Sequence, residues 1–408
     1  MIPTRASQHK AMIPSRYLAA SGFALIAVCY GFARFSFGLF LPGIDAELSL
    51  SSTLSGLISG GAFLTYCITV ILSAWLTERV GARYVAIGAA LIAAAGMAGI
   101  AMAPSAPWLA GAVMLAGSST GLVSPPLAAA VAAAVRPDRQ SATNSIINAG
   151  TGAGVALSGP VALLMGAQWR LAFAGFAAIA IGMAFAVAFT VPQRTHSPGK
   201  TRHGMPALDS AIRRLIAASF LTGAASTALW SFGGQLVALR LDWSGPRAGL
   251  LWIAIGAAGI AGAGAGAGIA RFGIDRVHRV FLTALATGIL LVGLDGTSPA
   301  LTLGGGLLFG AAYITLTGAY LLWGVAALPE RPATGVMIAF LALAIGQTAG
   351  APIFGMLMDG LTANHAVIAF ACLALCAGLS RAQGAGFTPH MAQEDKTGCE
   401  PMPCRIDR

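Results

Sequence analysis

An arginine stands in the middle of the first long apolar stretch of the sequence. The stretch runs from Tyr30 to Pro42, reads YGFARFSFGLFLP, and has Arg34 as its one formally charged residue. A charged side chain at the centre of a membrane helix costs about 2.5–3.5 kcal/mol on insertion scales, so it marks a functional site by default. The planar guanidinium fits a carboxylate, which it holds by two parallel hydrogen bonds. The chemistry that Arg34 predicts is therefore the binding of an anion.

Two interpretations of Arg34 differ in what faces it. In the first, it lies in a central cavity and binds an anionic substrate; in the second, it caps backbone carbonyls of a broken neighbouring helix. Tyr30 and Phe37 stand four residues before and three after Arg34, so a regular helix would place all three on one face. That spacing predicts a cavity wall with one charge and two aromatic rings. No acidic residue falls deep in an apolar stretch, which favours a substrate that carries its own negative charge.

The elements that must position these residues are membrane helices. The chain of 408 residues is 57% hydrophobic and 9% charged, against about 25% charged residues in ordinary soluble domains. A chain this apolar cannot cover a soluble surface with polar groups, so its surroundings must be lipid. A span needs about 20 apolar residues, and twelve such runs predict an all-α membrane protein. The runs are approximately 17–41, 53–76, 84–103, 107–134, 142–166, 171–191, 214–238, 248–270, 277–294, 300–326, 334–357 and 364–380.

A polar stretch divides the predicted spans into six and six. We predict two six-helix bundles at 17–191 and 214–381, joined by a cytoplasmic linker at 192–213. A short cytoplasmic segment, 1–16, precedes them, and a tail at 382–408, predicted to be disordered, follows.

The basic residues predict the orientation of these spans. Of the 24 Lys and Arg residues, all but four fall in segments on the same side as the two termini. The exceptions are Arg34, Arg170, Arg240 and Arg247. Because basic loops remain in the cytoplasm, both termini are predicted to be cytoplasmic. The predicted location is a bacterial cytoplasmic (inner) membrane, crossed several times.

The two halves have matching features at matching places. The loop after the fourth predicted span reads RPDRQSAT and the loop after the tenth reads LPERPATG. The spans that follow carry glycine pairs at 150 and 154 and at 346 and 350, with a proline soon after each pair. Parallel six-span repeats place a binding site near the midplane, between the halves, which opens to each side in turn.

A short loop motif resembles the signature of the major facilitator superfamily, and the likeness extends over essentially the whole chain. The loop after the second predicted span contains Glu78, Arg79, Gly81 and Arg83 in the order of that family's signature, with Ala74 where the family usually has its leading glycine. The resemblance implies twelve transmembrane helices in two pseudo-symmetric bundles. It also implies that this loop takes part in gating through charge pairing at the cytoplasmic face.

The fifth and first predicted spans extend the resemblance. Gly154 through Gly159-Pro160 looks like the glycine–proline signature often seen in exchangers and exporters, and we include these residues among the gating candidates. Arg34 and its neighbours resemble the poorly characterised YbfB/YjiJ-type branch, with Ala33 in place of a glycine. The arginine motif of the fourth helix in many proton-coupled members is absent, because a GSSTG run occupies that region.

The second half should supply the polar wall of the site. Polar side chains in membrane helices either bind ligands or join helices to one another, and each candidate allows both roles. Gln347, which follows a glycine near the middle of the eleventh predicted span, is the strongest of them. The others are Asn148 in the fifth span, Trp230 and Gln235 in the seventh, and Tyr313, Thr317 and Tyr320 in the tenth.

Taken together, these patterns predict a secondary active transporter of a small organic anion or carboxylate-bearing metabolite, working by alternating access. An alternative is a proton-driven exporter of drugs or amphipathic metabolites, and a second is a membrane sensor or enzyme on a transporter fold. The GSSTG run lies inside a predicted helix rather than at the strand-to-helix turn of a serine hydrolase, and all six histidines fall in loops, tails or span ends. We therefore expect no enzyme activity, metal, cofactor or nucleic-acid partner, and we expect a monomer in the lipid bilayer.

Overall fold

The computed structural model describes residues 15–165, 168–193, 209–243, 247–261, 265–328 and 330–382. Throughout these ranges the regular elements are helices. The predicted segment 1–16, the linker 192–213 and the tail 382–408 lie mostly outside the described residues. The helices are α1 (Ser15–Ile26), η1 (Ala27–Phe35), α2 (Ser36–Leu48), α3 (Ser52–Val80), α4 (Ala82–Ala101), α5 (Ala106–Ala134), α6 (Pro137–Met165), α7 (Trp169–Thr190), α8 (Ser210–Trp230), α9 (Gly233–Leu241), α10 (Ala248–Ala261), α11 (Ala265–Phe272), α12 (Ile274–Gly293), α13 (Pro299–Ala327), α14 (Pro332–Gly360) and α15 (Ala363–Ala377).

Most of these helices are long and apolar enough to cross a bilayer. Within the described residues nine qualify, or ten if α8 and α9 form one span bent by 45°. Two shorter apolar helices, α10 and α15, lie where the sequence predicts the eighth and twelfth spans. Large apolar side chains remain exposed on the outside of the bundle, among them Leu164, Phe185 and Leu379, as expected of a surface that faces lipid. The count of twelve spans stays a prediction.

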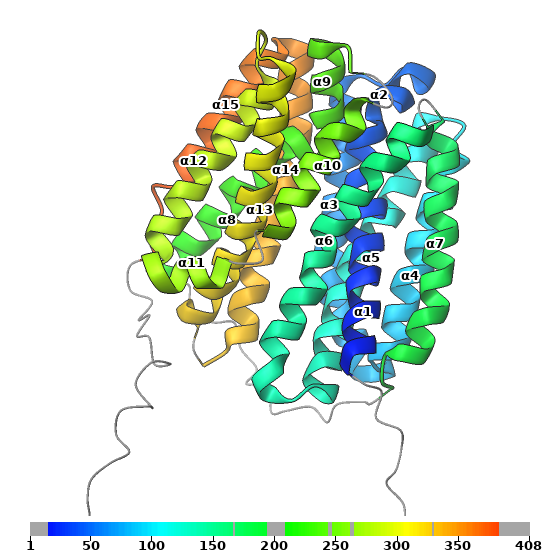
Figure 1. Ribbon diagram of the computed structural model, residues 1–408, viewed down its shortest axis with the longest axis vertical. Coiled ribbons are helices and arrows are strands. Elements are labelled where there is room, and N and C mark those ends of the chain that lie inside the picture. Colours follow the sequence, from blue (N-terminus) through cyan, green and yellow to red (C-terminus); the bar gives the residue numbers. More distant parts are fainter. Residues whose placement is uncertain are drawn as a thin grey trace, which may run out of the picture.

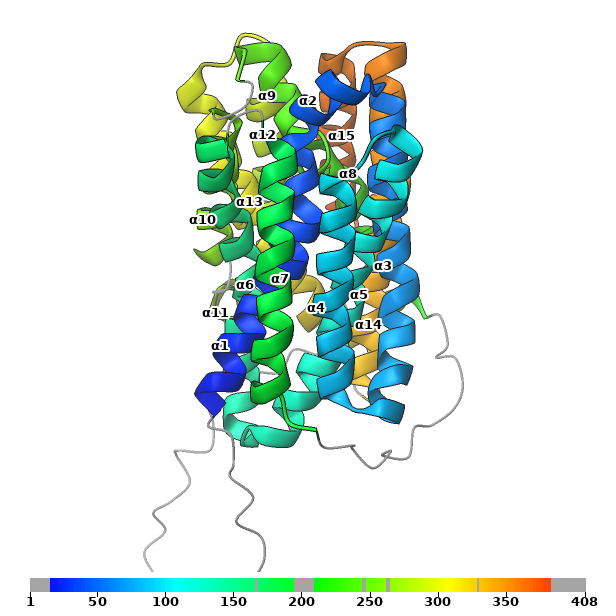
Figure 2. The same cartoon turned by 90° about the vertical axis from the view of Figure 1, so that its right-hand side faces the viewer.

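The helices form two groups that lean against each other (Figure 1). The first group contains α1 to α7 and the second contains α8 to α15. Figure 2 shows α1 and α2 as parts of one long rod that passes behind α7. Packing between the groups joins α3 to α14, α6 to α10, and α2 to α9.

The first span changes its helical geometry in the middle. Between α1 and α2, the nine residues of η1 form a π-helix, and the amide of Ser36 continues its pattern by bonding the carbonyl of Gly31. Gly31 faces the fifth span so closely that a Cβ there would lie 2.3 Å from the carbonyl carbon of Gly154. Only glycine permits this approach. π-Helical turns are rare and often occur at functional sites, and this one ends at Phe35, the residue after Arg34.

The seventh predicted span is broken. The chain turns by 45° between Trp230, where α8 ends, and Gly233, where α9 begins. Adjacent glycines at 233 and 234 lower the cost of such a break. At this point the two halves meet closely, because a Cβ on Gly38 of α2 would lie 2.2 Å from the carbonyl oxygen of Trp230.

One end of the molecule is closed by a carboxylate that links the halves. At the end of α14, Asp359 accepts hydrogen bonds from the backbone amides of Ser52 (3.2 Å) and Thr53 (2.7 Å) at the start of α3. Gln235 of α9 adds a bond of 3.4 Å to the Ser52 hydroxyl. A carboxylate at a helix N-terminus satisfies free amides and interacts favourably with the helix dipole. This contact holds the halves together at the end opposite the start of α1 (Figure 1).

Replacing Asp359 with alanine should loosen this end. A carboxylate cap is worth about 1 kcal/mol, so the population in which the end is open should rise about fivefold. The measurement is the rate at which a water-soluble maleimide alkylates Ser55→Cys, a position that is buried in the first turns of α3. Glu47→Gln is the control, because the partners of that carboxylate lie in its own half. Equal labelling rates with and without Asp359 would show that the contact does not hold the end closed.

Candidate functional site

Arg34 is buried between the two halves of the molecule, with 9% of its surface exposed. Its Nη2 donates a hydrogen bond of 2.7 Å to Oε1 of Gln347 in α14, and its Nη1 lies 3.5 Å from the hydroxyl of Thr120 in α5. Its Nε–H has no hydrogen-bond partner. Among the described residues, no carboxylate forms an ion pair with it. The guanidinium is therefore a buried cation with spare donors and a neutral main partner.

Four aromatic rings surround the guanidinium. Its central carbon lies 4.6 Å from the ring centre of Tyr66, 4.7 Å from Phe63, 5.3 Å from Phe35 and 5.7 Å from Tyr30. Contacts of this kind contribute about 0.5–2 kcal/mol each, more where water is excluded. They offset part of the cost of burying the charge, and they leave its N–H donors free for another group.

The predicted partner Phe37 is not one of these rings, although it is buried. The prediction assumed a regular helix over residues 30–37, with 3.6 residues per turn. The π-helix has more residues per turn, so it rotates the side chains after Gly31 away from that pattern. Tyr30 remains beside Arg34, and Phe35, the residue directly after Arg34, is a ring contact that the sequence did not predict.

Gln347 connects the guanidinium to the second half. Its side chain is fully buried, and its Nε2 donates to the hydroxyl of Tyr313 at 3.1 Å and lies 3.3 Å from that of Ser226. The amide oxygen thus faces the cation and the amide nitrogen faces two hydroxyls, a consistent arrangement for a glutamine. The predicted candidates Gln347 and Tyr313 are brought together with Arg34 in one network.

Trp230 extends the aromatic lining across the boundary between the halves. Its ring stacks on Phe35 with centres 4.1 Å apart, and it meets Tyr313 and Phe309 edge-on at 5.2 and 5.3 Å. The indole Nε1–H is buried without a hydrogen-bond partner. On the opposite side of the network, the hydroxyl of Tyr30 lies 3.1 Å from that of Ser124 in α5.

The network lies at the level expected for the centre of a bilayer. Arg34 stands near the middle of the 33-residue candidate span Arg16–Leu48, and Gln347 near the middle of Thr334–Gly360. Tyr66, Thr120 and Tyr313 each stand near the middle of a 29-residue span. Five helices that are far apart in sequence therefore present their polar and aromatic groups at one depth.

Other predicted wall residues lie elsewhere. Gln235 belongs to the closed end of the molecule, where it bonds Ser52. Thr317 bonds the carbonyl of Ile314 in its own helix, and Tyr320 belongs to a separate buried network with His278. Asn148 is exposed, one turn before Gly152, whose α-carbon faces Gly256 of α10.

The loop between α3 and α4 makes its described contacts within the first half. Gly81 has φ +93°, a conformation that strongly favours glycine, and it ends α3. The Nε–H of Arg83 donates a 2.6 Å hydrogen bond to the carbonyl of Val191 at the end of α7. The guanidinium of Arg79 lies over the ring of Trp75 at 4.0 Å, and Glu78 is exposed. The gating role of this loop stays a prediction.

The glycines of the fifth span serve close helix contacts. Gly154 packs against Ala27 and Gly31 of the first span, and Gly159 packs against Gly249 of α10 in the second half. Pro160 is exposed within α6. Gly159 therefore lies on the surface where the halves meet, and its role in gating stays a prediction.

Several residues of the network were not singled out in the sequence. They are Phe35, Phe63, Tyr66, Thr120, Ser124 and Ser226. Thr120 belongs to the GSSTG run, and polar residues in an apolar span are a signal that was available. The aromatic residues carry no such signal, because rings on a membrane helix face lipid about as readily as they face a site.

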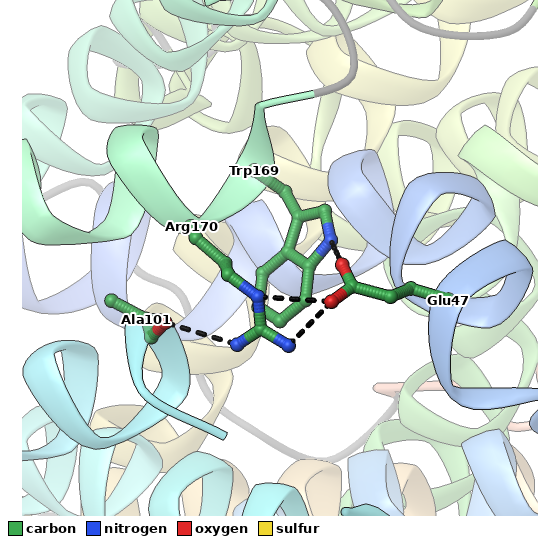
Figure 3. A network of polar contacts seen from close by, with 4 residues as sticks. All are labelled: Glu47, Ala101, Trp169 and Arg170. Atoms are coloured by element: carbon green, nitrogen blue, oxygen red, sulfur yellow. Dashed lines mark hydrogen bonds and ion pairs between the residues drawn. The ribbon is translucent and has the colours of Figure 1, made fainter. Parts of the chain in front are cut away.

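A polar cluster also lies away from Arg34, near the closed end (Figure 3). Glu47 accepts hydrogen bonds from Nη2 of Arg170 at 2.7 Å and from Nε1 of Trp169 at 2.9 Å, and Arg170 also donates to the carbonyl of Ala101 at 3.1 Å. A shallow surface depression of about 330 Å³ adjoins it. Half-exposed ion pairs of this kind contribute about 0–1 kcal/mol, and this one fastens α7 to the end of α2.

Solved structures of several transporters share this fold. The nucleoside transporter NupG covers 90% of this chain and 97% of its own, with a TM-score of 0.73 at 13% identity. The xylose transporter XylE from E. coli, in an inward-open conformation, covers 90% and 95% with a TM-score of 0.73 at 15% identity. The human organic anion transporter MFSD10 covers 90% and 99% with a TM-score of 0.65 at 19% identity. At these identities the likeness establishes the fold alone.

Comparison at the level of sequence identifies the family. No curated protein matches the chain significantly. The family model of the Major Facilitator Superfamily matches residues 23–351, which is most of the chain. The match agrees with the two groups of apolar helices and with the solved structures above. The chain therefore belongs to the Major Facilitator Superfamily and is a multi-pass membrane transporter.

Proposed function

We propose that this transporter carries a small organic anion, or a metabolite with one carboxylate, and that Arg34 binds its negative charge. The observation that supports the proposal is a guanidinium buried at mid-span depth that, among the described residues, has an unpartnered Nε–H and no carboxylate partner. A buried charge ordinarily has an ionic partner. A substrate anion would supply the missing charge.

The contact with Gln347 indicates how an anion would bind. The amide oxygen of Gln347 occupies one donor of the guanidinium fork at 2.7 Å. A carboxylate oxygen in that position would form a charge-assisted hydrogen bond about twice as strong as a neutral one. The second carboxylate oxygen would take a further donor of the same fork. We therefore expect the anion to displace Gln347 from Arg34.

The position of the network favours alternating access. Arg34 comes from the first half, whereas Gln347, Tyr313 and Trp230 come from the second. An anion held by Arg34 would replace contacts that now connect the halves. Its binding would therefore change the relative stability of the conformations that open to each side of the membrane. Parallel repeats with a midplane site are the arrangement in which such rocking occurs. The solved relatives are named for a nucleoside, a sugar and organic anions, so the substrate class rests on Arg34 rather than on the fold.

A panel of matched compounds tests the substrate class. Benzoate, nicotinate, lactate and pyruvate would be compared with their neutral amides and with benzylamine, first by thermal unfolding of purified protein and then by counterflow in proteoliposomes. We expect some of the carboxylates, and none of their amides at equal concentration, to raise the unfolding temperature and to exchange across the membrane. Stabilisation by amides or by the amine alone would contradict the proposal. So would a panel in which no carboxylate has any effect.

A further inference from the structure

A second buried network surrounds His278 in the other half of the molecule. His278 stands one turn from the start of α12 with 1% of its surface exposed. Its Nε2 lies 2.9 Å from the hydroxyl of Tyr320 in α13. That hydroxyl also lies 2.5 Å from the hydroxyl of Thr222 in α8 and 3.3 Å from the carbonyl of Ala218. The cluster joins three helices through one tyrosine oxygen.

Counting protons gives one consistent assignment of the donors in this cluster. The carbonyl of Ala218 can only accept, and the Tyr320 hydroxyl has one proton to donate. When Tyr320 donates to Ala218, its oxygen accepts from Thr222 and from the Nε2–H of His278. The other ring nitrogen, Nδ1, is then a free lone pair, and it has no partner in the described structure. This basic nitrogen is available to a proton, and the bonds on the Nε2 side are unchanged when it is protonated.

Charged groups of α12 itself act on the ring with opposite signs. Asp275 stands three residues before His278 and carries a negative charge, and Arg279 directly after it carries a positive one. Asp275 also accepts a 2.6 Å hydrogen bond from the backbone amide of Ala382, just after α15. A positive charge on the ring would therefore attract the carboxylate of Asp275, which is bonded to the segment after α15.

The neighbouring helices face the ring with uncharged groups. α13 contributes the Tyr320 hydroxyl and the ring of Trp323, whose centre lies 5.6 Å from the imidazole. On α8 the nearest charged residue is Arg214, one turn before Ala218. Arg271 of α11 and Arg381 after α15 are exposed. Protonation would thus place one new positive charge in surroundings that offer Asp275 as the nearby counter-charge.

Helix α13 connects this network to the Arg34 network. Tyr313 and Tyr320 are seven residues apart, which is two turns or about 10.5 Å along the helix, and they lie on the same face. Tyr313 accepts a hydrogen bond from Gln347, the partner of Arg34. A shift of α13 that follows a change at Tyr320 would therefore move a group of the Arg34 network.

We propose that His278 is a proton-binding site that makes the conformational equilibrium of the transporter depend on pH, acting through Tyr320 and α13. The proton comes from water, binds Nδ1 and leaves the ring with one positive charge. In the packing seen here the new Nδ1–H is buried without an acceptor, which costs free energy. Acid therefore disfavours this packing relative to a conformation that admits water to the ring. The proposal depends on the proposed transport cycle only in requiring two conformations.

The test is a distance measurement that needs no substrate. Spin labels at Val80→Cys in α3 and Phe272→Cys in α11 report the separation of the halves at one end, since both positions are exposed. The background carries serine at Cys372, Cys376, Cys399 and Cys404. By double electron–electron resonance in lipid, the population with the distance of the present structure should fall by at least half between pH 8 and pH 5. In His278→Gln, which can still donate to Tyr320, this response should disappear.

Control variants separate this proposal from general effects of acid and from failure to fold. His365→Gln, at an exposed histidine bonded to Thr362, should respond like the wild type. Tyr320→Phe removes the acceptor of the Nε2–H in this packing only. This destabilises the packing relative to the conformation that admits water, so the midpoint of the response should move to higher pH. A wild type that does not respond to pH, or a response unchanged in His278→Gln and in Tyr320→Phe, would overturn the proposal.

The outcome is independent of the anion proposal. Arg34→Gln should keep the pH response of the distances, because Arg34 is not part of the His278 network. If Arg34 proves not to bind anions, the response of His278 remains measurable. If His278 proves inert, the carboxylate panel remains a valid test of the substrate class.

Discussion

Replacing Arg34 with glutamine should lower the exchange of a transported carboxylate about 100-fold. Loss of one member of a buried, hydrogen-bonded charge pair typically costs about 2–5 kcal/mol in binding, and this range contains a factor of 100. The fold should survive, because in the described part of the chain Arg34 has no ion pair to lose and one of its donors is already unpartnered. Counterflow in proteoliposomes measures the rate, and thermal unfolding of the purified variant confirms that it is folded.

Arg34→Lys distinguishes charge from geometry. Lysine keeps the positive charge but lacks the planar fork that holds both oxygens of a carboxylate. Exchange should therefore be intermediate, about tenfold below wild type. Arg170→Gln is the matched control, since it removes a guanidinium that is paired with Glu47 near the closed end; its exchange rate should remain within about twofold of wild type, as for a weak surface pair. An equal loss of carboxylate exchange in Arg34→Gln and Arg170→Gln would indicate a general structural effect instead.

Gln347→Glu should also abolish carboxylate exchange, and it should do so without destabilising the protein. The new carboxylate would lie where the amide oxygen now accepts from Arg34 at 2.7 Å. It would supply the missing counter-charge and compete with any substrate anion for the same donors. We expect at least a tenfold loss of carboxylate affinity, together with an unfolding temperature equal to or above that of wild type, because a buried charge gains its partner.

Gln347→Met is the control for this substitution. Methionine has a similar volume, cannot accept strongly from Arg34, and leaves the guanidinium free. If Gln347 acts as a stand-in for the anion, this variant should keep or improve carboxylate affinity while losing the bonds to Tyr313 and Ser226. Carboxylate exchange that is retained in Gln347→Glu would contradict the role of Arg34, since the site would then tolerate a permanent negative charge.

Two predictions, a division into halves and a binding role for Arg34, could be made from the sequence. Both depend on properties that do not require tertiary structure, namely the length of apolar runs and the cost of a charge inside one. Gln347 was found for the same reason, as a polar residue in the middle of an apolar span. It lies 2.7 Å from Arg34, although 313 residues separate the two along the chain.

The details that the sequence missed depend on geometry that periodicity does not encode. The π-helix of the first span moves Phe37 out of the network and brings in Phe35, and no composition signal marks it. Tyr320 has the same residue type and helix face as Tyr313, yet it lies two turns away and bonds His278. Depth and rotation of one helix against another follow from packing between the halves, such as the approach of Gly31 to Gly154. His278 is near a span end as expected, but burial there reflects the packing of α8 and α13.

Whether Arg34 recognises negative charge can be measured as one ratio, the exchange rate of a carboxylate divided by that of its neutral amide. For the best carboxylate of the panel and its neutral amide, counterflow is measured in wild type and in Arg34→Gln at equal protein and lipid. If Arg34 recognises negative charge, the wild type should prefer the carboxylate at least about 100-fold. Arg34→Gln should lose that preference, mainly because carboxylate exchange falls. A carboxylate preference that stays the same in Arg34→Gln would contradict this role of Arg34.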